Sequence, residues 1–359
     1  MSILLLMCVG GLFAGLLLLR RVPVVTARLP ATNGPVSVSV IIPARNEEAN
    51  LPMLLESLSA PRIGSMQLIV VDDGSTDNTS GVAARYGATV ICSAPLPAGW
   101  TGKTWACHQG ALAATGEIFC FLDADTRFVR DGYARIVETF PSLPHNTVLS
   151  VLPFHRIERW YEELSLFFNI VMAMGAGGFG KLDAPHLFGQ SLLVRREMYF
   201  KSGGHESVKS EILENLNFAS RVIRSQGSTC ALGGRGTLEM RMFPHGVAQL
   251  RESWQKAFAA GAGRTSPFVL WLSIYWLSAA MLACFMPMVT NQSLRSFAIA
   301  VYLFSVIQIA WYGRQLGTFR LAAALLYPIA LMFYFATFAQ SMWRQRRGKP
   351  AAWRGRTVC

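Results

Sequence analysis

Hydrophobic positions alternate between strand-like and helix-like patterns through the middle of the chain. Runs rich in Val and Ile occur in VSVSVII from Val36, in LIVV from Leu68 to Val71, in ATVICSA and in EIFCFL. Helix-like segments separate these runs, so the pattern predicts one α/β domain over 35–264 with a mostly parallel sheet. In such sheets, ligands bind beyond the carboxyl ends of the strands.

Four stretches without any charged residue show continuous hydrophobicity instead. They cover 2–19, 265–294, 296–313 and 321–343. The first is long enough to span a bilayer, and it precedes Arg20 and Arg21, which reverses the charge order of a cleaved signal peptide. We therefore expect an N-terminal membrane anchor over 1–21, membrane segments over 265–343 and a basic tail over 344–359.

The net charge of +12 and the pI near 9.7 originate in the apolar part of the chain. No Asp or Glu follows Glu252, whereas 11 Lys or Arg do, and only 15% of all residues are charged. Basic residues among apolar segments are typical of anchoring beside anionic lipid, so we expect a bilayer and no nucleic acid as partner. Seven scattered cysteines without a CxxC pair favour reduced thiols in the cytoplasm.

The positive-inside tendency determines the expected topology. If the 35–264 domain is cytoplasmic, two C-terminal crossings keep the basic tail inside, whereas three would place it outside. We therefore expect a multi-pass membrane protein with a cytoplasmic domain and a cytoplasmic tail. One apolar segment is then re-entrant or interfacial, and the short 297–312 segment is the first candidate.

Acidic residues follow two of the predicted strands. Asp123 and Asp125 come after FCFL, and carboxylates in this arrangement suit Mg²⁺ or Mn²⁺ completed by water and substrate phosphates. An isolated pair of this kind is more often a solvated turn, but its position after a buried strand and downstream of a second acidic pair favours the metal. That second pair, Asp72 and Asp73, either starts a turn or accepts hydrogen bonds from a nucleobase or ribose.

Two other segments carry candidate binding groups. Asn46 and Glu47 follow the first strand and are typical of a helix start with Asn46 as its cap, a role that is compatible with ligand binding. Lys103 follows a Gly-rich turn and precedes an apolar helix, which would bring its ammonium near a phosphate, although GxxxxGK[ST] is absent. A lone lysine is more often solvated.

Four motifs occur in the order and spacing of the family 2 glycosyltransferases: SVIIPARNEEANL, VVDDGSTD, GWTGKTWACHQGA and FLDADT. Further segments resemble the bacterial branch that acts on carotenoid acids and is associated with hopanoids, including HLFGQSLLVRREMYFKSGGHESVKSEILEN and the closing WRGR. The resemblance covers residues 36 to about 260 and extends weakly to the tail. It implies a nucleotide-sugar-binding GT-A fold in an enzyme of the bacterial inner membrane.

The resemblance also implies roles for individual residues. The nucleotide sugar is expected to contact Pro43, Asn46, Glu47, Asp72, Asp73, Ser75, Lys103, Asp123 and Ala124. Asp125 is expected to hold the Mg²⁺ or Mn²⁺ ion, with Asp123 on the ribose or on the metal. The acceptor and diphosphate side is expected at Gly189, Gln190, Arg251, Trp254 and Lys256. The last three are equally typical of an amphipathic interfacial helix, and LRESW in place of QxxRW argues against polymerisation.

The catalytic carboxylate departs from the family pattern. Relatives carry a Glu-Asp pair before a helix near the acceptor, and the Asp is usually assigned as the base. This chain has Glu214 and Asn215 at that position. Because Asn takes up no proton, three alternatives remain: Glu214 acts, Glu211 reaches in, or the acceptor is a carboxylate that is already ionised and needs no base.

The expected reaction is a single displacement with inversion, with Asp125, Glu214 and Asn215 at the catalytic position. A sugar moves from a nucleoside diphosphate, UDP and glucose by analogy with the family, to a lipid acceptor such as a carotenoid acid or hopanoid. One alternative is transfer to a polyprenyl phosphate or a ceramide-type lipid. Another is a catalytically silent scaffold that binds nucleotide sugar in a lipid pathway, for which Asn215 is the support.

Overall fold

The computed structural model describes residues 2–25, 36–58, 65–175, 179, 186–211, 213–261, 266–347, 351–353 and 356–358. The chain divides into two compact units. The sheet unit comprises Pro23–Phe154 and Pro185–Arg241. The helical unit comprises Met1–Val22, His155–Ala184 and Met242–Cys359.

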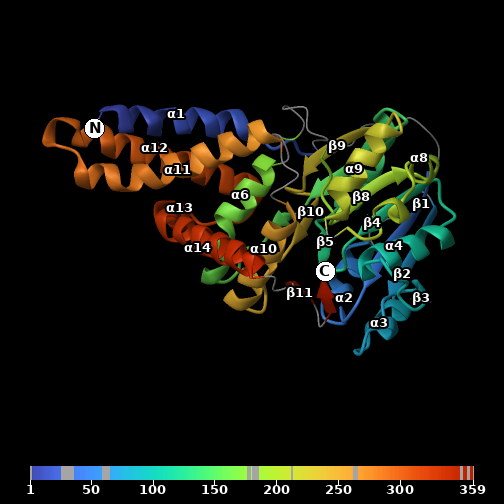
Figure 1. The fold of residues 1–359 in the computed structure, drawn as a ribbon. Coiled ribbons are helices and arrows are strands. Elements are labelled where there is room, and N and C mark those ends of the chain that lie inside the picture. Colours follow the sequence, from blue (N-terminus) through green and yellow to red (C-terminus); the bar gives the residue numbers. More distant parts are fainter. Residues whose placement is uncertain are drawn as a thin grey trace. The chain divides into compact units, whose positions relative to one another are not determined.

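Many of the elements of both units are labelled in Figure 1. The sheet unit contains β1 Ser37–Ala44, α2 Leu51–Leu58, β2 Ser65–Asp72, α3 Thr79–Arg85, β3 Thr89–Cys92, α4 Gly102–Ala113, β4 Ile118–Leu122, β5 Thr126–Phe128, α5 Gly132–Thr139, η1 Phe140–Ser142, β6 Thr147–Leu152, β8 Ser191–Arg195, α8 Arg196–Lys201, η3 His205–Val208, α9 Glu214–Arg224, β9 Ser228–Gly233 and β10 Leu238–Met240. The helical unit contains α1 Ser2–Leu18, η2 Trp160–Ser165, α6 Leu166–Gly175, α10 Val247–Gly261, α11 Pro267–Val289, α12 Gln292–Leu316, α13 Leu321–Leu325, α14 Tyr327–Arg346, β11 Ala351–Trp353 and β12 Arg356–Val358. The two-residue strand β7, Phe154–His155, lies at the boundary between the units in the sequence.

A seven-stranded sheet in the order β3-β2-β1-β4-β8-β6-β9 forms the centre of the sheet unit. β1 pairs in parallel with β2 and β4, β2 with β3, and β6 with β9. β8 runs antiparallel to both β4 and β6. The predicted mostly parallel α/β sheet is therefore confirmed, and β1 to β4 coincide with the four hydrophobic runs of the sequence.

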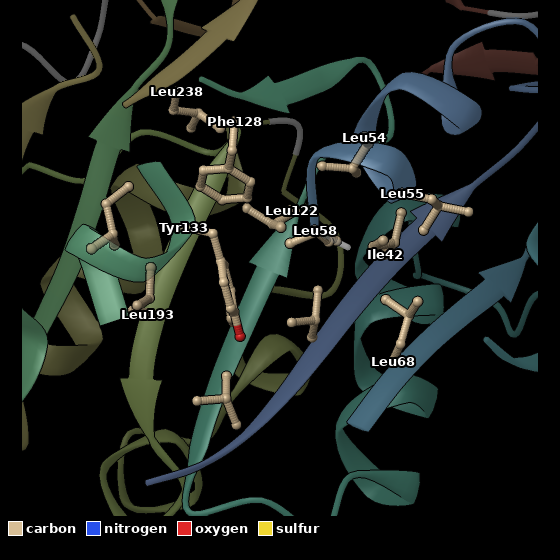
Figure 2. Close-up of a cluster of buried hydrophobic side chains, with 14 of the residues drawn as sticks. Ile42, Leu54, Leu55, Leu58, Leu68, Leu122, Phe128, Tyr133, Leu193 and Leu238 are labelled. Atoms are coloured by element: carbon tan, nitrogen blue, oxygen red, sulfur yellow. The ribbon is translucent and has the colours of Figure 1, made fainter. Parts of the chain in front are cut away.

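Both faces of this sheet are covered, which explains why its strands are hydrophobic at nearly every position. Ile42 of β1 packs with Leu54 of α2 and Leu122 of β4 in one core (Figure 2). Its neighbour Ile41 points to the opposite face, into a second core that contains Phe119. All five side chains are at most 1% exposed, and this burial holds the strand ends in fixed positions.

Three apolar helices, α1, α11 and α12, lie side by side in the helical unit (Figure 1). Glycine permits the close approach of α1 and α11, because a Cβ at Gly11 would lie 2.1 Å from the Cβ of Ala279. The Tyr275 hydroxyl donates to the Met7 carbonyl at 2.9 Å, which fixes the register of the two helices.

Two described helices are long and apolar enough to cross a membrane: α11 with 23 residues and α12 with 25. The N-terminal helix α1 is shorter, at 17 residues. The 297–312 segment, expected to be too short to cross, belongs to α12, which includes the charged residues Arg295 and Arg314 and has 25 residues. Its length therefore gives no reason to consider it re-entrant or interfacial. The stretch 321–343 is instead divided into α13 and α14 at Leu326.

Two segments of the predicted 35–264 domain pack with the apolar helices rather than with the sheet. They are the described parts of 155–184 and 242–261, which carry η2, α6 and α10. At the C-terminus, β11 and β12 pair in antiparallel, with Trp353 opposite Arg356. Arg354 and Gly355 of the WRGR motif lie outside the described residues.

Candidate active site

The loop after β1 is joined to the loop after β2 by hydrogen bonds of Asn46. Asn46 has a φ of 54°, a conformation that Asn tolerates better than most residues. Its N–H donates to Ser75 Oγ at 3.0 Å, and its Oδ1 accepts from the Thr76 N–H at 2.8 Å. Asn46 is thus bound across the strand ends and does not cap a helix, and α2 begins only at Leu51.

The two aspartates after β2 have different surroundings. Asp72 accepts from the Ser75 N–H at 2.8 Å and from the Ser80 hydroxyl, so both of its oxygens are engaged in the turn. Asp73 donates its N–H to the Ala44 carbonyl at 2.8 Å, and Arg45 lies 3.8 Å from its carboxylate. Asp72 therefore stabilises the turn, and the carboxylate of Asp73 lies beside the Arg45 cation at the strand ends.

Asp123, Ala124 and Asp125 follow β4 at the same edge of the sheet. The Asp123 N–H donates to the Gln190 carbonyl at 3.0 Å, which ties this loop to the segment before β8. Ala124 is buried between the two partly exposed aspartates. The side-chain oxygen of Gln190 is buried without a hydrogen-bond partner among the described residues.

Lys103 joins three of the predicted site residues from the first turn of α4. Its Nζ lies 2.7 Å from Asp123 Oδ1 and 3.1 Å from Glu214 Oε1, and it donates to the Gly189 carbonyl at 3.0 Å. Burial alone would lower the pKa of Lys103, but the carboxylates of Asp123 and Glu214 outweigh it and raise the pKa. Lys103 therefore remains a cation, and the solvated-lysine alternative does not describe it.

Glu214 and Asn215 begin α9 and face the loop before β8. The Asn215 amide donates to the Leu187 carbonyl, which anchors that loop to the helix. A Cβ on Gly189 would lie 3.1 Å from Glu214 Oε1 and 3.3 Å from Asn215 Oδ1, so a larger residue there would force these side chains to shift by a few tenths of an ångström. Glu214 is 9% exposed and is held by Lys103, whereas Asn215 acts as a tether.

The residues after β4 suit a divalent cation that the substrate helps to coordinate. In the described ranges, no three His, Cys, Asp or Glu side chains gather into a site that could hold a metal by protein ligands alone. Asp123 and Asp125 offer two partly exposed carboxylates at one edge of the sheet. Mg²⁺ and Mn²⁺ are commonly bound by one or two carboxylates together with water and phosphate oxygens, so this donor set fits them.

The predicted acceptor-side residues of α10 belong to the helical unit. Trp254 is 7% exposed and stacks on Phe168 with ring centroids 4.7 Å apart. Its indole N–H has no hydrogen-bond partner in the described part of the chain. Arg251 is exposed, and the side chain of Lys256 lies outside the described residues. Trp254 is therefore a packed aromatic residue rather than one at the surface of an interfacial helix.

Two contributors to the site are absent from the sequence predictions. Thr79 is fully buried, and its hydroxyl accepts from the Glu47 N–H at 2.9 Å and donates to Asp77, which secures the loop after β1. His205 lies behind Lys103, where burial lowers its pKa to about 3 and Tyr199 hydrogen-bonds its Nδ1 at 2.9 Å. The polar run STDNT next to the Asp72-Asp73 pair could have indicated that Thr79 contributes to the site. Nothing in the sequence around His205 distinguishes it from an ordinary loop residue.

Comparison with known proteins identifies the family of the chain. Residues 39–203 match the family model of glycosyl transferase family 2, and the chain belongs to that family of enzymes, which the sequence motifs had indicated. It is similar to the 4,4'-diaponeurosporenoate glycosyltransferase of Staphylococcus aureus (strain USA300), with 32% identity over 330 residues that cover 89% of this chain and 88% of the relative.

A solved structure shows the same fold. The mannosyltransferase of Pyrobaculum calidifontis, determined in complex with GDP-Man and Mn²⁺, matches with a TM-score of 0.53 and 17% identity. The match covers 95% of this chain and 99% of that chain. The GT-A fold predicted from the motifs is therefore confirmed.

Proposed function

We propose that this enzyme transfers a sugar from a nucleoside diphosphate sugar, UDP-glucose in the first instance, to an acidic polyisoprenoid lipid such as a carotenoid acid. The similarity to the diaponeurosporenoate enzyme carries this proposal, because it extends over 89% of the chain and so includes the apolar helices as well as the sheet unit. In the reaction, the acceptor oxygen attacks C1 of the sugar, the bond from C1 to the diphosphate oxygen breaks, and the nucleoside diphosphate departs.

The charges around Lys103 support this chemistry. The difficult event is the departure of the diphosphate, on which negative charge develops. Lys103 is a fixed cation 2.7 Å from Asp123, at the strand ends where the donor is expected to bind. A divalent ion held by Asp125 and Asp123 would supply further neutralisation of the leaving group.

The tether made by Asn215 favours an acceptor that needs no base. Asn215 takes up no proton and is engaged with Leu187, and Glu214 forms an ion pair with Lys103 at 3.1 Å. A carboxylic acid with a pKa near 4 is already ionised at neutral pH, so its oxygen attacks without transferring a proton. In this proposal Glu214 orients Lys103 and takes no proton from the acceptor.

Substitutions at three positions test this division of roles. With a carotenoid acid as acceptor, Glu214→Gln is expected to lower kcat by less than about tenfold, because removing a general base commonly costs 10²- to 10⁴-fold. Asn215→Asp is expected to give no increase. A tenfold gain from Asn215→Asp, or a loss of 100-fold from Glu214→Gln or Glu211→Gln, would assign a base and remove the proposal of an unassisted carboxylate.

The outer faces of the apolar helices support attachment to a membrane. Trp271 and Met288 of α11 are 71% and 76% exposed, and Phe304 and Ile307 of α12 are 60% and 62% exposed. Polar groups lie inside instead, where Gln308 accepts from the Trp276 indole at 2.9 Å. Apolar side chains outside and polar side chains inside are the arrangement expected for helices in lipid.

We further propose that α11 and α12 cross the bilayer with α1 beside them, and that the sheet unit and the tail are cytoplasmic. Arg20, Arg21 and Arg314 lie at one end of these helices, and Arg295 lies at the other, which agrees with the positive-inside tendency. Protease treatment of sealed inside-out vesicles is expected to remove the tail. Protection of the tail would contradict this topology.

The substrate proposal is tested by incubating membranes that contain the full chain with UDP-glucose and four acceptors: a carotenoid acid, a hopanoid alcohol, a polyprenyl phosphate and a ceramide. The expected result is release of UDP together with a glucosyl ester of the acid, identified by mass spectrometry. If the glucosyl product forms on another lipid, that lipid is the acceptor and the carotenoid acid is not. The absence of UDP release with every lipid would indicate a binding scaffold.

A further inference from the structure

We propose that the helical unit has a site for an anionic glycerophospholipid, separate from the donor site, at the end of α12. The site is a shallow surface groove between three helices that encloses no cavity and is partly open to solvent. Its walls are apolar and are formed by Leu166, Ile309, Phe319 and Leu321. Its rim carries the guanidinium groups of Arg314 and Arg320.

The two arginines are available to an anion. Arg314 forms no hydrogen bond or ion pair with any other described residue. Arg320 has one acidic neighbour, Glu163, whose Oε1 lies 3.8 Å from its Nε, and its side chain remains 64% exposed. Guanidinium groups bind phosphate in a bidentate manner, so two of them beside each other suit a phosphodiester headgroup.

Apolar surface continues from the groove in the direction of the lipid-facing side chains. Ile307 and Trp311 of α12 are 62% and 56% exposed, and Leu321 and Leu325 of α13 are 51% and 47% exposed. A small water-soluble anion would use only the two arginines and leave this surface uncovered. A molecule with a phosphate and an acyl chain uses both, which is why we assign a lipid rather than a free phosphate or nucleotide.

The position of Arg314 along α12 agrees with a headgroup. Arg295 and Arg314 stand in the first and last turns of the helix, about 28 Å apart at 1.5 Å per residue. The hydrocarbon core of a bilayer is about 30 Å thick, so a helix that spans it places Arg314 at the depth of the phosphates. Arg20 and Arg21 lie at the same end, since the Trp311 indole donates to the Arg20 carbonyl at 3.2 Å. This site therefore depends on the proposed crossing of α12.

Native mass spectrometry of the full chain in detergent, titrated with phosphatidylglycerol or phosphatidylcholine, tests the site. We expect the wild type to retain phosphatidylglycerol about tenfold better than phosphatidylcholine, and the double variant Arg314→Gln, Arg320→Gln to lose that preference. Arg295→Gln is the matched control on the same helix and should retain it. A double variant that keeps the wild-type preference for phosphatidylglycerol would overturn the proposal, and so would an equal loss of preference in Arg295→Gln.

A second variant tests the apolar walls without altering the charge. Ala310→Trp places a bulky side chain into the groove and is expected to weaken retention of both phospholipids at least fivefold, with an unchanged unfolding midpoint. If the double arginine variant instead raises the KM for the carotenoid acid tenfold and keeps its phosphatidylglycerol preference, the groove belongs to the acceptor and the proposal is overturned.

The failure of this inference is distinguishable from the failure of the proposed function. Extraction of membranes with alkaline carbonate reports on bilayer insertion, and UDP release reports on transfer. A protein that stays in the membrane and transfers sugar, but shows no phosphatidylglycerol preference, would contradict the lipid site alone.

Discussion

The two units of this enzyme place apolar and polar side chains in opposite ways. In the sheet unit, Ile41 and Ile42 are completely buried, whereas the charged groups of Lys103 and Asp123 lie partly exposed at the strand ends. In the helical unit, Trp271 is 71% exposed and Gln308 is largely buried. This distribution is what we expect if the sheet unit faces water and a charged substrate and if, as proposed, the helical unit faces hydrocarbon.

The contrast supports the proposal that the two units of this chain have different surroundings. The hydrophobic effect favours burial of apolar surface only where the surroundings are water. In lipid, helix association depends instead on close packing and on polar contacts between helices. The contacts at Gly11 and Gln308 are of these two kinds. The following substitutions affect one unit and leave the other unchanged if the contrast is correct.

Asp125→Ala is expected to have the largest effect. Losing an electrostatic contact to the leaving group costs roughly 3 to 4 kcal/mol of barrier, so kcat should fall at least 100-fold while the protein stays folded in the membrane. Steady-state UDP release measures this. Glu117→Ala changes an exposed carboxylate next to the other end of β4 and serves as the control. More than a tenth of the activity in Asp125→Ala would contradict the prediction.

The stability of the helical unit is expected to fall in acid because of His155. This residue is 1% exposed, neither ring nitrogen has a hydrogen-bond partner among the described residues, and burial lowers its pKa to about 4. The unfolded chain, with a pKa near 6.5, therefore binds the extra proton as the pH falls from 6.5 to 4. The stability present above pH 6.5 is lost over that window, up to about 3 kcal/mol.

Thermal unfolding midpoints at pH 7.5 and pH 5 measure this effect. His155→Leu removes the titrating group and is expected to reduce the difference between the two midpoints. His145→Leu, at an exposed position of the sheet unit, should leave the difference as it is. The same acid sensitivity in wild type and in His155→Leu would show that another group is responsible.

Gly11→Val is expected to disturb the helical unit by a smaller amount. The new Cβ would lie 2.1 Å from that of Ala279, and overpacking of this kind costs about 1 to 3 kcal/mol. The unfolding midpoint should fall while binding of UDP-glucose, measured by calorimetry, keeps its affinity. Leu6→Ala, at a 66% exposed position of α1, is the control. Lost donor affinity in Gly11→Val would contradict the independence of the units.

Gln308→Leu is expected to have the smallest effect. It removes the bond from the Trp276 indole at 2.9 Å and the bond to the Leu12 carbonyl at 2.7 Å. Polar contacts between membrane helices average about 0.6 kcal/mol, so the midpoint should fall only slightly. Gln292→Leu changes an exposed glutamine at the start of α12 and should have no effect. A loss above about 2 kcal/mol would suggest that these helices are not in lipid.

The sequence predicted the local elements better than their partners. β1 to β4 match the four hydrophobic runs because local periodicity identifies a strand. The position of β8 between β4 and β6 was not predicted, since strand order depends on contacts between distant segments. The capping role of Asn46 was also wrong, because its side chain bonds to Thr76 of another loop.

The sequence by itself determined which chemical groups this protein has. They are the acidic pairs near the ends of β2 and β4, the Glu-Asn pair at 214–215 in place of the family's Glu-Asp, and the uncharged segments followed by basic residues. Only the tertiary structure decided that Lys103 joins Asp123 to Glu214, and that Asn215 fastens the loop before β8. Residue types and local periodicity are recorded in the chain itself. A salt bridge between segments far apart in sequence exists only after the sheet order brings them within about 3 Å of each other.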